Sequence, residues 1–87
     1  MNKQEILQKV QNVLDNKKIN YIKNSLKYLK YEENGMARDG VKKNMHLICY
    51  YLDIQSDNLI LHTVFVDAET DDLMYIITPH GYIEIEK

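Results

Sequence analysis

The sequence predicts an α+β domain in which two N-terminal helices pack on a four-stranded antiparallel β-meander. Apolar residues recur at helical spacing in the N-terminal part, the period changes to two after residue 44, and short polar segments separate the later apolar runs. We therefore expect a single domain over residues 1–87, helical in 1–33, with a loop in 34–44 and the sheet in 45–87.

The first helix is expected over residues 3–15. Asn2 followed by Glu5 has the outline of an N-terminal capping box, because an asparagine side chain can accept hydrogen bonds from the first free amides of a helix. The apolar side chains of this segment fall within about 120° of the helix circumference: Ile6, Leu7, Val10, Val13 and Leu14.

A second helix is expected over residues 19–31, and Asn34-Gly35 follows as its C-terminal cap. Its apolar stripe is rotated from that of the first helix, so we place a break at residues 15–18. The stripe consists of Ile19, Ile22, Leu26 and Leu29. An alternative stays open, because the side chains of residues 26–33 also alternate as they would in a strand.

Four strands are expected over residues 45–54, 59–66, 73–78 and 82–87. Short connections between them favour antiparallel pairing of neighbours. Residues 55–58 and 68–72 are the first two connections, and Pro79 and Gly81 occupy positions typical of a type I turn in the third.

The first two predicted strands are apolar on both faces, and two helices can cover only one face of the sheet. An uncovered apolar face normally marks an interface, which predicts a homodimer or a bound protein partner. The alternative is that the sheet curls and the helices wrap it more fully. The candidate interface residues are Tyr50, Tyr51, Leu52, Phe65 and Tyr75.

The net charge of −2 conceals two oppositely charged halves. Residues 1–43 hold ten lysines and arginines against five acidic residues, whereas residues 44–87 hold one lysine against eight. The opposite signs favour internal attraction between helices and sheet. They also permit a nucleic-acid or nucleotide hypothesis, because lysines can meet phosphates and tyrosines can stack on bases. The predicted second helix would present Lys23, Lys27, Tyr28 and Lys30 for this purpose.

Motifs for catalysis and for cofactor binding are not found in the sequence. Serine hydrolase, phosphate-loop and dinucleotide fingerprints are missing. The acidic segment 67–72 has oxygens at positions 1, 3 and 5 of a calcium loop but lacks its glycine and its final glutamate. His46, Cys49 and His62 lack the short spacing of metal ligands. We therefore expect no enzyme activity, no cofactor and no metal.

The function expected from the sequence is that of a non-catalytic protein-binding module. It would act by occupying a partner's surface, as small bacterial or phage inhibitors and immunity-type proteins do. The single cysteine, the lack of a signal peptide and the lack of any apolar run of about 18 residues favour a cytoplasmic protein without a membrane partner. A small-ligand pocket lined by tyrosines, between helices and sheet, is a further alternative.

Overall fold

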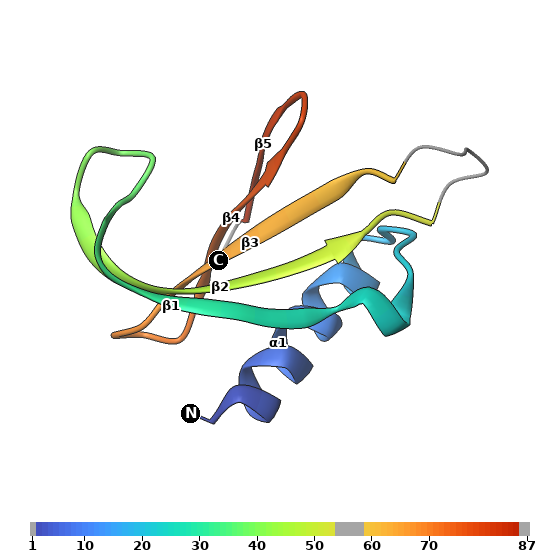
Figure 1. Ribbon diagram of the computed structural model, residues 1–87, viewed down its shortest axis with the longest axis horizontal. Coiled ribbons are helices and arrows are strands. Elements are labelled where there is room, and N and C mark those ends of the chain that lie inside the picture. Colours follow the sequence, from blue (N-terminus) through green and yellow to red (C-terminus); the bar gives the residue numbers. More distant parts are fainter. Residues whose placement is uncertain (1, 54–58, 86–87) are drawn as a thin grey trace.

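The fold is one helix packed on a five-stranded antiparallel sheet (Figure 1). The computed structural model describes residues 2–53 and 59–85. Helix α1 (Lys3–Asn16) and a 3₁₀ turn, η1 (Lys23–Ser25), precede β1 (Lys27–Met36), β2 (Lys42–Tyr51), β3 (Leu61–Asp67), β4 (Leu73–Thr78) and β5 (Gly81–Glu84). The strands lie side by side in chain order, and each is antiparallel to the next. We call the face toward α1 the inner face and the opposite one the outer face.

The prediction of two helices on a four-stranded sheet was wrong. Residues 19–31 form η1 and the start of β1, which pairs with β2 along its length, so the alternative of a strand at 26–33 is the one the structure has. Two positions of the supposed helical stripe, Ile22 and Leu29, are exposed by 36% and 49%, so no buried helical face exists here. Pairing with an apolar neighbouring strand outweighed the local helical pattern.

The strand boundaries also differ from the predicted ones. Residues 34–44, expected to form a loop, supply the end of β1, a turn and the start of β2. The predicted connection at residues 55–58 and Ile54 lie outside the described residues. The last strand is shorter than predicted and follows a tight turn in which Thr78 pairs with Gly81, whose φ of 139° suits glycine.

Helix α1 forms as the sequence predicts. The Asn2 side-chain oxygen accepts a hydrogen bond from the Glu5 backbone N–H at 2.9 Å, which satisfies one of the free amides of the first turn. Ile6, Val10 and Leu14 are buried against the inner face of the sheet. Their contacts make this face the main core, together with Tyr21, Ile48, Tyr50, Val64, Val66, Leu73 and Ile76.

A polar pair lies inside this core. The Tyr50 hydroxyl and His62 Nδ1 are hydrogen bonded at 2.9 Å, and Tyr21 contacts the Tyr50 ring edge to face. Burial lowers the pKa of His62 and raises that of Tyr50, so the neutral forms of both side chains are favoured. The core therefore contains a histidine that resists protonation.

Acid should destabilise the protein through His62. The unfolded chain takes up a proton on this side chain near its ordinary pKa of 6.5, whereas the folded chain does so only at lower pH. As the pH falls below that value the unfolded state gains protons first, and stability falls by up to about 1.4 kcal/mol per pH unit until the folded pKa is passed.

Urea denaturation of the wild type and of His62→Gln at a series of pH values measures this effect. We expect the wild type to lose stability more steeply than His62→Gln below pH 6.5. His80→Gln, at an exposed position of the β4–β5 turn, should follow the wild type. Parallel curves for the wild type and His62→Gln would contradict the prediction.

Candidate functional site

The outer face of the sheet has charged side chains at its two borders and apolar side chains between them. On β1, Lys27, Lys30 and Glu32 pair in register with Cys49, Leu47 and Met45, and Lys30 forms an ion pair with Glu32 at 2.7 Å, so this border of the face is charged. The middle is apolar and aromatic, and the ring of Phe65 stacks on Tyr75 with centroids 5.0 Å apart. Glu84, opposite Tyr75 on the last strand, places a carboxylate at the other border.

The turn between β1 and β2, residues 37–41, folds over part of this face, and we call it the cover turn. A second small core forms beneath it from Ala37, Met45 and Leu47, with Phe65 and Met74 against it. The sheet curls so that the β1–β2 hairpin rises on the side away from α1 (Figure 1). Part of the second apolar face is thus covered within the chain.

Arg38 joins the cover turn to the last strand. Its guanidinium carbon lies 4.2 Å from the centre of the Tyr82 ring, and its side chain forms an ion pair with Glu84. A guanidinium over an aromatic face and beside a carboxylate is attracted by both. This one side chain therefore connects the two ends of the curled sheet.

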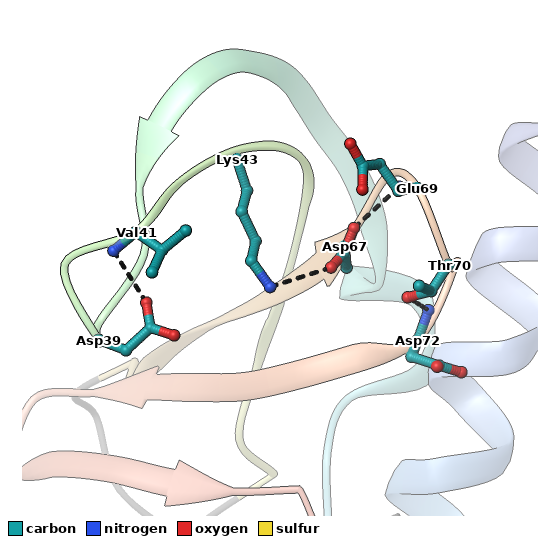
Figure 2. A network of polar contacts seen from close by, with 7 residues as sticks. All are labelled: Asp39, Val41, Lys43, Asp67, Glu69, Thr70 and Asp72. Carbon is teal, nitrogen blue, oxygen red and sulfur yellow. Dashed lines mark hydrogen bonds and ion pairs between the residues drawn. The ribbon is translucent and has the colours of Figure 1, made fainter.

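A cleft of about 520 Å³ opens between the cover turn, the β3–β4 turn and the end of β5. Its charged lining comprises the cations Arg38 and Lys43 and the carboxylates Asp39, Asp67, Asp72 and Glu84. Lys43 reaches Asp67 at 3.3 Å, and Asp39 accepts a hydrogen bond from the Val41 backbone N–H at 3.0 Å (Figure 2). Several of these charged side chains therefore make contacts within the chain that stabilise the two turns.

Asp67 organises the β3–β4 turn. One carboxylate oxygen accepts from the Glu69 backbone N–H at 2.8 Å, and the other contacts Lys43 (Figure 2). Burial would raise the pKa of Asp67, but these hydrogen bonds and the lysine charge outweigh it and hold the pKa below its ordinary value. The acidic segment 67–72, which matches a calcium loop only in part, is a turn in which Asp67 is used internally.

The outer face beyond the cover turn remains open. Tyr51 pairs with Leu61, Thr63 with Ile77, and Ile77 with Tyr82, so these side chains form a continuous strip across β2 to β5. Leu61 and Tyr82 are exposed by 44% and 49%, and the other three are half-buried. We call this strip of five residues the open patch.

The structure separates the predicted interface residues. Tyr50 and Leu52 belong to the main core, Tyr50 completely buried and Leu52 packed against it. Tyr75 lies on the outer face but is buried, whereas Tyr51 and Phe65 are half-buried there.

Leu61, Ile77 and Tyr82 were missed as candidates. Alternation along β3 places Leu61 on the same face as Phe65, which was the signal available for that residue.

The proposed nucleic-acid residues do not form one surface. Lys23 is on η1, while Lys27 and Lys30 lie on the outer face of β1. Tyr28 pairs with Ile48 on the inner face, where its hydroxyl is hydrogen bonded to His46 at 2.7 Å and Lys3 lies over its ring. The tyrosine is therefore engaged on the opposite side of the strand from the lysines.

His46, His62 and Cys49 are also divided between faces. The two histidines are on the inner face, opposite Val66 and Tyr50, whereas Cys49 is on the outer face opposite Thr63 and is buried. Among the residues the structure describes, no three histidine, cysteine or acidic side chains gather closely enough to hold a metal ion.

Comparison of the chain with models of known protein families, with curated proteins and with solved structures found no significant match. Within residues 2–53 and 59–85, no helix has the length and apolar character needed to cross a membrane. The candidate functional site therefore depends on the geometry of the outer face alone.

Replacing Asp67 should loosen the β3–β4 turn. Asp67→Ala removes the acceptor for the Glu69 N–H and the partner of Lys43, and we expect a loss of about 1–3 kcal/mol in urea denaturation. Glu69→Ala keeps the backbone N–H and should change stability by less than about 0.5 kcal/mol. Equal effects of the two substitutions would show that the Asp67 carboxylate does not support the turn.

Proposed function

We propose that the protein is a non-catalytic protein-binding module whose contact surface is the open patch. The observation that carries the proposal is the run of four apolar or aromatic side chains, with Thr63 among them, across β2 to β5, where Leu61 and Tyr82 are the most exposed. A mainly apolar strip that runs across neighbouring strands is typical of protein contact sites, and tyrosine is enriched in them.

Two properties of the surroundings support this function. The cover turn already buries the neighbouring part of the outer face, so the open patch has a firm border. Lys27 and the Lys30–Glu32 ion pair on one side, and Glu84 with its partner Arg38 on the other, place charged groups at its rim, where they can orient a partner. A small domain of this kind would act by covering a partner's surface, as an inhibitor or immunity-type protein does, and we place it in the cytoplasm of a bacterium or phage-infected cell.

The nucleic-acid alternative has less support. Base stacking requires aromatic rings beside the lysines that meet phosphates. Tyr28 lies on the other face from Lys27 and Lys30, and its ring and hydroxyl are engaged by Lys3 and His46.

Site-specific photo-crosslinking tests the open patch. A benzophenone amino acid in place of Leu61 should give a covalent adduct with another protein in extract of the source organism. The same group in place of Tyr31, a residue of similar exposure on the inner side of β1, should not. A second substitution, Tyr82→Lys, should reduce the adduct at position 61 at least tenfold, since it places a charge in the apolar strip.

Equal adduct yields from positions 61 and 31, or no adduct from either, would overturn the proposal. Circular dichroism of each variant confirms that the fold is kept. Met36→Lys, at an exposed apolar position outside the open patch, is the control for an added charge and should leave the adduct unchanged.

A further inference from the structure

The two edges of the sheet differ in how they are protected. β1 is interrupted by two register shifts along β2 and carries lysines and glutamates, which are devices that discourage further strand pairing. β5 pairs with β4 without a register shift, and residues 81–85 contain neither lysine nor proline. Among the described strands, β5 is therefore the edge that could accept another strand.

The backbone groups that β5 presents to solvent follow from its pairing. Thr78 pairs with Gly81 across the tight turn, Ile76 pairs with Ile83, and the Ile85 N–H donates to the Met74 carbonyl at 3.4 Å. The odd-numbered residues thus direct their N–H and C=O groups toward β4. Because these directions alternate along a strand, Tyr82 and Glu84 direct theirs away from the sheet.

We propose that a second copy of this chain pairs with this edge, the two β5 strands running antiparallel about a twofold axis at Ile83. In this register Tyr82 of each copy lies opposite Glu84 of the other. Both residues then exchange their outward N–H and C=O groups, which gives four backbone hydrogen bonds. The result is a continuous ten-stranded sheet, five strands from each copy.

Side chains favour the same register. On the outer face, antiparallel pairing places Tyr82, with Arg38 over its ring, next to the carboxylate of Glu84 from the second copy. Opposite charges are thereby brought together twice by the symmetry axis. On the inner face Ile83, which packs at the margin of the main core, meets its own symmetry mate and extends that core.

The pairing closes at two copies. Both β5 edges are used up by the twofold contact, and the remaining edges are the interrupted, charged β1 strands. The proposal goes beyond the protein-binding function proposed above, because it uses the backbone edge of β5. It is tested on the purified protein alone, so either proposal can fail without the other.

Disulfide trapping tests the register. A non-hydrogen-bonded antiparallel pair has its Cα atoms about 4.5 Å apart, within the range that a disulfide spans. Ile83→Cys in a Cys49→Ala background should therefore oxidise to a covalent dimer in high yield. Tyr82→Cys in the same background, although more exposed, should not, because the two Tyr82 positions are offset along the strands.

Mass measurement tests the association itself. The wild type should shift reversibly from monomer toward dimer between micromolar and millimolar concentration in sedimentation velocity. Tyr82→Pro removes an N–H that points away from β4, so it should keep the fold by circular dichroism and lose the dimer. Tyr82→Ala keeps the N–H and should retain most of the association.

Two results would overturn the proposal. One is a wild type that stays monomeric throughout the concentration series. The other is a dimer whose disulfide yield at position 83 is no greater than at position 82, which would place the contact elsewhere. The second result remains decisive if Tyr82→Pro fails to fold.

Discussion

One helix covers only one face of a sheet whose second strand, β2, is apolar on both, and the other features of the molecule follow from this constraint. The second face is covered in part because the β1–β2 hairpin bends and the cover turn packs on the outer face. Ala37 then closes a second small core over Met45 and Leu47, and Arg38 reaches β5. The area that remains open is narrower than a whole sheet face.

The main core combines apolar packing with a few polar contacts. The helix packs against β2, β3 and β4 through Ile6, Val10 and Leu14. Inside the same core, the side chains of Tyr50 and His62 are hydrogen bonded to each other. A buried hydrogen bond contributes little to net stability but is costly to break on one side only. The pair therefore favours one alignment of β2 against β3, and a slip by one residue would separate the two side chains.

The sequence predicted the parts whose signals are local. The cap at Asn2 and the spacing of Ile6, Val10 and Leu14 were enough to define α1, and alternation with short turns located most of β2 to β5. The second helix failed because Ile22 and Leu29 match a helical period yet are exposed, and only contact with β2 makes residues 27–36 a strand. The predicted interface residues lie on different faces for a similar reason. The sequence does not distinguish Tyr50 from Tyr51, whereas packing against the face that carries α1 buries Tyr50.

Arg38 has a consequence for how the molecule responds to its solution. The bend of the sheet is held at one end by a partly exposed guanidinium that acts through charge, on Glu84 and on the face of Tyr82. Added salt weakens exposed charge interactions of this kind, whereas the apolar contacts of Ala37 are not weakened in this way. Ionic strength would therefore adjust how tightly the hairpin closes, and with it how much apolar surface the protein shows, while the helix and the main core stay unchanged.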